Sequence, residues 1–193
     1  GLVGADSVYN GSLWGIKGET DLGGGMKGFG QVEQGFAANS ANGLVGDGKA
    51  RVGKIGISGG FGSIALGAQW GPYDNTTGYG DGQDYNGFSA YGRVLNMGAH
   101  GDNGNGGAAG QTVASLQYTS PSYGGLVYEV NYAPSKDATT NTDNSSYGVD
   151  AVYTGGPLTV AVAFDSTPTS VSNVGGSATG KTTAWKVEGG YDL

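Results

Sequence analysis

A glycine-rich run near the end of the sequence has the spacing of a phosphate-binding loop. Residues 175–182 are Gly-Gly-Ser-Ala-Thr-Gly-Lys-Thr, and in such loops backbone amides and the lysine hold phosphate groups. That mechanism requires a helix directly after the loop, with its N-terminus facing the phosphates. The residues that follow alternate as a strand up to Tyr191, so we interpret the run as a loop without a phosphate site.

Residues 102–106 and the neighbouring His100 are the other candidates for chemistry. Asp-Asn-Gly-Asn-Gly offers oxygen ligands, but it lacks the bidentate acid of a calcium loop. The sequence has one histidine and no cysteine, which excludes a histidine metal cluster, a thiolate zinc site and a cysteine nucleophile. We therefore expect no catalytic residue, no metal and no cofactor, and the protein is not expected to be an enzyme.

The global composition excludes further classes. Only 9 residues are Lys or Arg and the formal net charge is -7, so the sequence lacks the basic surface of a nucleic-acid-binding protein. The longest apolar run, Leu158 to Phe164, is too short for a transmembrane helix. The first residues lack the basic and apolar regions of a signal peptide, and we expect an exported protein whose signal is absent from this sequence.

Period-2 alternation recurs along the chain and predicts β-strands. In residues 126–132, for example, Leu126, Tyr128 and Val130 share one face, whereas Glu129 lies on the other. Nine segments follow this pattern, and residues 2–9 form a further possible stub. The nine are residues 12–20, 26–36, 50–58, 63–69, 113–120, 126–132, 147–153, 158–165 and 183–191.

Short and long connections alternate between these segments, which predicts an antiparallel meander. The long polar connections are residues 37–49, 70–112, 133–145 and 166–182. The sequence contains 42 glycines among 193 residues and few Leu, Ile, Val and Phe residues, too few for the core of a soluble nine-stranded sandwich. A transmembrane β-barrel needs no large core, because its apolar face contacts lipid and its polar face contacts water.

Particular segments resemble those of Gram-negative general diffusion porins. Residues 13–23, Leu-Trp-Gly-Ile-Lys-Gly-Glu-Thr-Asp-Leu-Gly, are similar to the second strand of that family, and residues 31–36 to the third. Residues 51–67 resemble the fourth and fifth strands with the turn between them. Residues 118–125 and 153–158 are similar to later turns, and the order of all these segments matches the family.

The resemblance implies an all-β, 16-stranded antiparallel barrel in the bacterial outer membrane. It also implies a homotrimer, surrounded by lipid, through which small hydrophilic solutes and ions diffuse passively. Residues 1–193 would form one porin-type domain that supplies nine or ten of these strands, so we expect either an incomplete domain or a shorter barrel. A barrel of about 10 strands is filled by side chains, whereas 16 strands leave an aqueous channel, which favours the incomplete domain.

The resemblance also implies a pore constriction. Residues 70–112 match the long loop that folds into the barrel of such porins, where its carboxylates face basic residues on the wall. Leu13 stands where the second strand often has an inward arginine, which weakens the positive side. Together with the net charge of -7, this predicts a weak preference for cations. The residues assigned to the constriction are Asp74, Asp81, Asp84, Arg51 and Arg93.

The placement of Arg51 has a consequence for Lys54. If Arg51 points into the pore, strict alternation sends Lys54 outward, where a lysine at mid-depth in lipid costs about 2–4 kcal/mol. Lys54 would then lie near an interface or against another subunit. A different strand register is the other explanation.

Two other functions remain open from the residues alone. The chain could be a small outer-membrane barrel that anchors its long loops for a structural or adhesive role, without a wide pore. It could also be a soluble all-β binding module with glycine-rich loops. Solvated loop charges remain the simpler interpretation of the five constriction residues.

Overall fold

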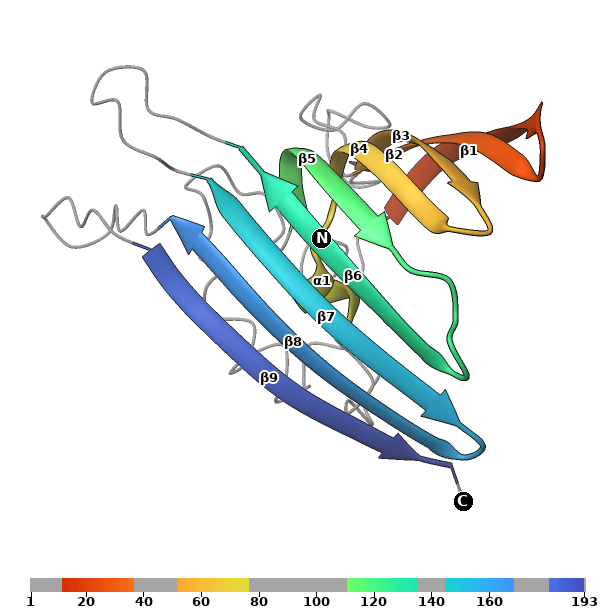
Figure 1. The fold of residues 1–193 in the computed structure, drawn as a ribbon. Helices are drawn as coiled ribbons and strands as arrows, with labels where there is room; N and C mark the ends of the chain where they lie inside the picture. Colours follow the sequence, from red (N-terminus) through yellow and green to blue (C-terminus); the bar gives the residue numbers. More distant parts are fainter. Residues whose placement is uncertain (1–11, 37–51, 77–110, 135–144, 169–180, 193) are drawn as a thin grey trace, which may run out of the picture.

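A computed structural model describes residues 12–36, 52–76, 111–134, 145–168 and 181–192 of the chain. Within these ranges the chain forms nine strands and one short helix, α1 (Pro72–Asn75) (Figure 1). The strands are β1 (Ser12–Gly23), β2 (Met26–Phe36), β3 (Val52–Gly59), β4 (Gly62–Trp70), β5 (Gln111–Thr119), β6 (Leu126–Ala133), β7 (Ser146–Gly155), β8 (Leu158–Pro168) and β9 (Lys181–Tyr191).

All nine predicted strands are confirmed, with ends that differ by a few residues. They form one antiparallel sheet in which each strand pairs with its neighbours in the sequence, in the order β1 to β9. The stub expected over residues 2–9 lies outside the described residues. Within the described strands, β1 pairs with β2 alone and β9 with β8 alone, so the sheet has two edges and does not close.

The short turns lie at one end of the sheet, where consecutive strands are joined directly (Figure 1). The first of these turns requires glycine, because Gly23, Gly24 and Gly25 have φ angles of 81°, 63° and 78°. L-residues with a side chain rarely adopt such angles. The remaining strand ends, those of β2, β4, β6 and β8 and the starts of β3, β5, β7 and β9, lie at the opposite end.

Most large apolar side chains of the strands share one face of the sheet and are exposed there, whereas Phe29 and the buried Val52 lie on the other face. Paired residues lie on the same face, and the register aligns Ile55 with Leu66 and Leu66 with Leu116. All three are exposed, with Ile55 69% accessible. On β7 and β9, aromatic residues stand near both ends of this face with small or aliphatic residues between them: Tyr147, Tyr153, Trp185 and Tyr191.

The opposite face is polar and partly covered. Its buried side chains include Gln69, Gln117 and Asn131, and Asn131 donates a hydrogen bond to Gln117 across β5 and β6 over 2.9 Å. The buried apolar residues of the described chain are mostly alanines, so this face contains no large aliphatic core. The chain is thus polar on its covered side and apolar on its exposed side, the reverse of a soluble sheet.

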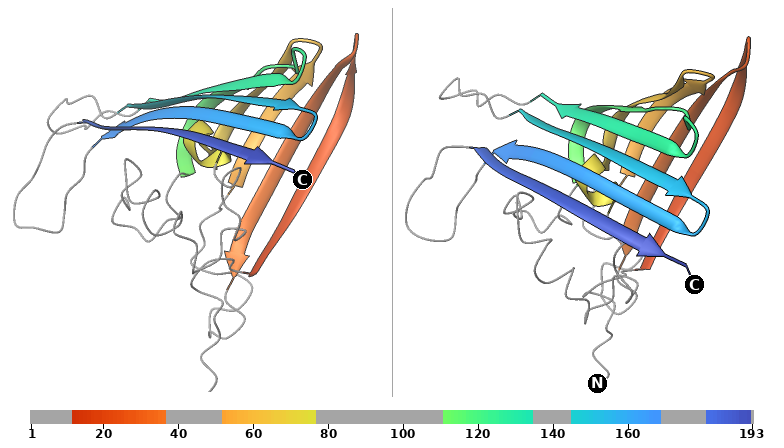
Figure 2. Two further views of the ribbon diagram at one scale, coloured as in Figure 1. Left: turned by 90° about the horizontal axis from the view of Figure 1, so that it is seen from below. Right: turned by 60° about the horizontal axis from the view of Figure 1, so that its bottom comes forward.

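The sheet is curved, and α1 lies inside the curve (Figure 2). We call this side the inner face and the apolar side the outer face. Within the described ranges, no helix has the length and hydropathy needed to cross a bilayer.

Candidate functional site

The charged side chains that the structure describes in the strands all lie on the inner face. The register shows this, because Lys17 pairs with Gln31, Gln31 with Lys54 and Lys54 with Gly67, whereas the apolar residues between them form the outer ladders. Carboxylates outnumber lysines in this set. Its members are Lys17, Glu19, Asp21, Lys27, Glu33, Lys54, Glu129, Asp150, Asp165, Lys186 and Glu188.

The expected outward placement of Lys54 is wrong. Lys54 lies on the inner face and is partly exposed, because the outer ladder of β3 consists of Gly53, Ile55 and Ile57. No lysine of β3 therefore has to be accommodated in lipid or against another subunit. The sequence left two explanations for Lys54, a position near an interface or another subunit and a different strand register. The different register is the correct one.

A bulge in β4 bends the chain just before α1. The pairing of β4 with β5 shifts between Gly67 and Gln69, and Gly67 has a φ of 130°, which L-residues with a side chain rarely adopt. Ser115 donates a hydrogen bond to the carbonyl oxygen of Gly67 over 3.0 Å, and Gln69, 1% exposed, donates to Ser115 Oγ over 3.3 Å. These buried bonds fix the strand end from which the chain passes to the inner face.

The helix α1 is a single turn packed against β6, β7 and β8. Pro72 occupies its first turn, where a missing N–H costs nothing, and Thr76 ends it by donating a side-chain bond to the Tyr73 carbonyl over 3.0 Å. Gly148 on β7 lets α1 approach the sheet closely, because glycine has no side chain. A Cβ added at Gly148 would lie 3.3 Å from Pro72 Cδ and 3.1 Å from Asp165 Oδ1, tighter than ordinary contacts.

A buried ion pair lies beneath the aromatic ring of α1. Lys186 Nζ is 2.9 Å from Glu188 Oε1, and the two side chains are 4% and 5% exposed. The same ammonium lies 4.4 Å from the centroid of the Tyr73 ring, within the range of a cation–π contact. Tyr73 is itself buried, so the ring covers the pair.

A second polar contact joins α1 to β6. Asn75 donates a hydrogen bond to Glu129 Oε2 over 2.6 Å, and Thr119 donates to the other carboxylate oxygen over 2.8 Å. The backbone N–H of Glu129 donates to Asp150 on β7 over 3.1 Å. Glu129 thus connects α1 with three neighbouring strands.

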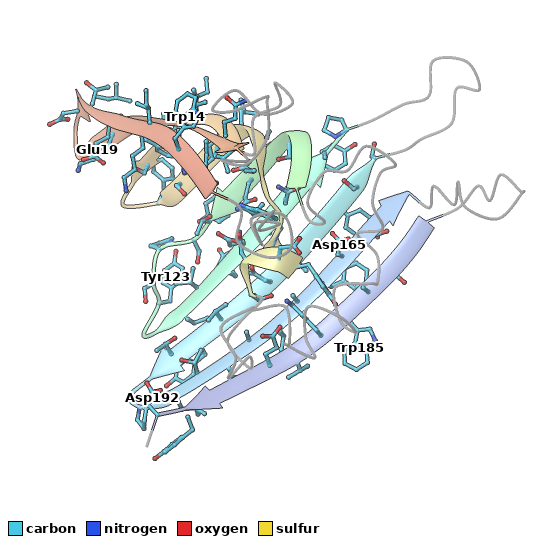
Figure 3. The ribbon with its side chains drawn as sticks, turned by 180° about the vertical axis from the view of Figure 1, so that it is seen from behind. Trp14, Glu19, Tyr123, Asp165, Trp185 and Asp192 are labelled. Atoms are coloured by element: carbon cyan, nitrogen blue, oxygen red, sulfur yellow. The ribbon has the colours of Figure 1, made fainter. Side chains whose placement is uncertain are left out.

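The carboxyl group of Asp74 has an unusual acidity. Its pKa is raised from 3.8 to about 7: burial is the main cause, Lys186 lowers the pKa, and the nearby Asp165 raises it. The pKa of the Tyr73 hydroxyl is also raised, first by burial and then by Asp74 and Glu188. Figure 3 views the inner face, on which Asp165 lies beside α1.

Of the five residues assigned to the constriction, the structure describes one. Asp74 lies on the inner face, in α1, and its role at a constriction stays a prediction. The other four, Asp81, Asp84, Arg51 and Arg93, lie outside the described residues, and their assignment also stays a prediction. Among the described residues, no group of three possible metal ligands gathers.

Sequence reasoning did not single out Tyr73, Lys186, Glu129 or Gly148. A signal for Lys186 was present, because Lys186 and Glu188 are charged residues two positions apart on one face of a strand whose other face is apolar. Such a pair points to a polar environment on that side. No signal in the sequence indicates that Tyr73 covers the pair, since the contact joins residues from distant parts of the chain.

Comparison with known proteins yields one family. The whole chain, residues 1–193, matches the family model described as Gram-negative porin. It is 31% identical over 210 residues to an outer membrane porin protein of Bordetella pertussis, covering 97% of this chain and 50% of that protein. It is 29% identical over 151 residues to the major outer membrane protein P.IB of Neisseria gonorrhoeae, covering 77% of this chain and 39% of that protein.

Solved structures share the fold, and one of them is a porin by name. An anion-selective porin from Comamonas acidovorans superposes with a TM-score of 0.70 at 21% identity, over 93% of this chain and 53% of that one. OmpF of Salmonella typhi, in a complex with daunomycin, gives 0.64 at 22% identity, over 93% and 54%. At these identities the likeness shows the fold alone. The chain spans about half the length of the proteins it matches, or less.

Proposed function

The chain belongs to the Gram-negative porin family, and on that premise we propose that the protein forms a water-filled channel for passive diffusion of small hydrophilic solutes and ions. The family is one of outer-membrane channels rather than enzymes, and its relatives from Bordetella and Neisseria are named as outer-membrane proteins. The whole protein would complete the barrel that the nine described strands begin.

The separation of the two faces supports the proposal most strongly. The described charges of the strands lie on the inner face, and the exposed aliphatic side chains lie on the outer one. A sheet with this separation fits a barrel that has water inside and lipid outside. The aromatic residues near both ends of β7 and β9 fit the two membrane interfaces.

We further propose that residues 70–112 form the constricting loop of this channel. The position of α1 on the inner face supports this assignment, because α1 is the beginning of that segment. Asp74, Asp81 and Asp84 would supply negative charge, and the wall would supply the positive side. Arg51 and Arg93 are the basic residues proposed there. For Arg51 the proposal requires a break in strict alternation before Lys54, because Lys54 lies on the inner face.

The proposed partners are lipid and further copies of the chain. Outer-membrane lipid would cover the outer face, and three copies would associate as a homotrimer. Single-channel recording of the purified protein in planar bilayers tests the main proposal. We expect stepwise openings in groups of three, whereas a purified protein that shows no openings would contradict the channel function.

The sign of the ion selectivity needs its own test. The excess of carboxylates among the inner-face charges and the net charge of -7 support a weak preference for cations. An anion-selective porin shares the fold, so the side chains rather than the fold must set the sign. Replacing both Asp81 and Asp84 with Asn should lower the ratio of cation to anion permeability. An unchanged ratio would remove these two residues from the constriction.

The small closed barrel without a pore receives no support from the described strands. Because β1 and β9 pair with one neighbour each, these nine strands leave two open edges instead of closing on themselves. The soluble binding module conflicts with the exposed apolar outer face and with the family to which the chain belongs.

A further inference from the structure

Three contacts from three different strands hold α1 on the wall. Pro72 lies in the space left open by Gly148 on β7, and Asn75 bonds Glu129 on β6 over 2.6 Å. The third contact places the Tyr73 ring 4.4 Å from Lys186 Nζ on β9. Since α1 is a single turn, it has too few internal bonds to hold its own place, and these contacts determine where it lies.

Lys186 is suited to anchoring rather than to attracting ions. Its side chain is 4% exposed, its charge is balanced by Glu188 at 2.9 Å, and the Tyr73 ring lies over it. A cation whose charge is balanced by a carboxylate at 2.9 Å leaves a dipole rather than a net charge, so it adds little to the field felt by ions in the channel. Lys54, on the same inner face of β3, is partly exposed and provides the contrast.

We propose that Lys186 is a positioning residue that acts through Tyr73: it fixes α1 against the channel wall and contributes little to ion selectivity. The proposal rests on the proposed channel function. The Tyr73 ring is attracted to the ammonium, and the ring carries α1 with it. Removal of the ammonium frees one end of this attachment, so that α1 departs from the wall more often.

Hydrogen exchange measures this departure directly. The amide groups of Asp74 and Asn75 bond the Gly71 carbonyl, and that of Thr76 bonds the Pro72 carbonyl, so these amides are protected while the turn is intact. In the full-length protein, Lys186→Met should speed their exchange about fivefold, which corresponds to about 1 kcal/mol of lost attraction. Lys186→Arg should keep exchange near the wild-type rate, because arginine also binds aromatic faces.

Single-channel currents separate the positioning role from a direct role of the charge. Lys186→Met should raise the noise of the open-channel current and leave the cation-to-anion permeability ratio near that of the wild type. Lys54→Met, the matched loss of a more exposed lysine, should raise the permeability ratio without added noise. A Lys186→Met channel that changes its permeability ratio as much as Lys54→Met does, with quiet current and slow exchange, would overturn the proposal.

Changes on α1 itself guard against a folding defect of the wall. Tyr73→Leu removes the ring and should reproduce the faster exchange and the noise, whereas Tyr73→Phe keeps the ring and should stay close to wild type. Gly148→Leu, whose side chain would meet Pro72 and the Asp165 carboxylate but leaves Lys186 and Glu188 in place, displaces α1 and should add noise as well. If Tyr73→Leu exchanges as slowly as Tyr73→Phe, the ring does not hold α1 and the proposal fails. Exchange reports on α1 even in a protein that conducts no ions, so failure of the channel function would be recognised separately.

Discussion

Asp74 is a carboxyl group whose ionisation depends on wall residues far along the chain. Burial is the main reason that its pKa rises from 3.8 to about 7, with Asp165 adding to the rise and Lys186 opposing it. A raised pKa means that the packed α1 favours the protonated form. The stabilisation from this carboxyl is therefore fully present below about pH 4 and is lost as the pH rises through about 7.

This sign predicts that α1 is held more tightly in acid. After correction for intrinsic exchange rates, the amides of α1 should be better protected at pH 5 than at pH 8, both chosen as test values about the pKa of about 7. Asp74→Asn cannot ionise and should show a smaller difference between the two values. An equal difference in Asp74→Asn and wild type would assign the pH dependence to other groups.

At the scale of the element, β4 shows how a strand can redirect the chain. Alternation predicts where β4 lies, but the bulge at Gly67 determines how the strand ends and how the chain passes to α1. A Cβ at Gly67 would collide with the Gly53 carbonyl oxygen on β3. The bulge therefore needs glycine both for its backbone angle and for the close approach of β3.

Gly67→Ala should accordingly destabilise the protein by about 1–3 kcal/mol, the usual cost of an L-residue in such a conformation. The free energy of unfolding from urea titration in detergent measures the loss. Gly18→Ala on β1 is the matched control, because a Cβ there meets nothing within 4 Å, and we expect a change of about 0.5 kcal/mol or less. Equal losses in the two variants would show that the bulge tolerates a side chain.

At the scale of the whole molecule, the two faces of the sheet face different solvents. Ala151 and Val152 are neighbours on β7, but the register places Ala151 on the outer face, opposite Tyr128 and Val162, and Val152 on the inner one. Only the outer position would contact lipid in the proposed barrel. Substitutions at Ala151 and Val152 therefore compare lipid with water at nearly the same depth in the membrane.

Lysine at the two positions should have unequal effects. Ala151→Lys places an ammonium in lipid and should lower the free energy of unfolding in vesicles by about 2–4 kcal/mol if the site is near mid-depth. Val152→Lys, on the water-filled side, should change it by about 1 kcal/mol or less. Heat-modifiable migration in detergent gels shows whether each variant still folds. A greater loss for Val152→Lys would reverse the assignment of the faces.

Much of the fold could be predicted because alternation is a local signal. All nine strands followed from the alternation of apolar and polar residues, and their antiparallel order followed from the alternation of short and long connections. The candidate site was less predictable. Asp74 was named from resemblance, whereas Tyr73 and Lys186 meet only after the sheet has curved.

The order of residues is sufficient to identify the strands, the composition of their two faces and the family, since each depends on residues that are close in the chain or on segments in a fixed order. The folded structure was needed to establish the inward side of Lys54 and the attachment of α1 to β6, β7, β8 and β9. The register of β3 depends on pairing with β2 and β4, which strict counting from Arg51 cannot include. Contacts between distant segments depend on curvature and on a single bulge, and period-2 alternation carries no information about either.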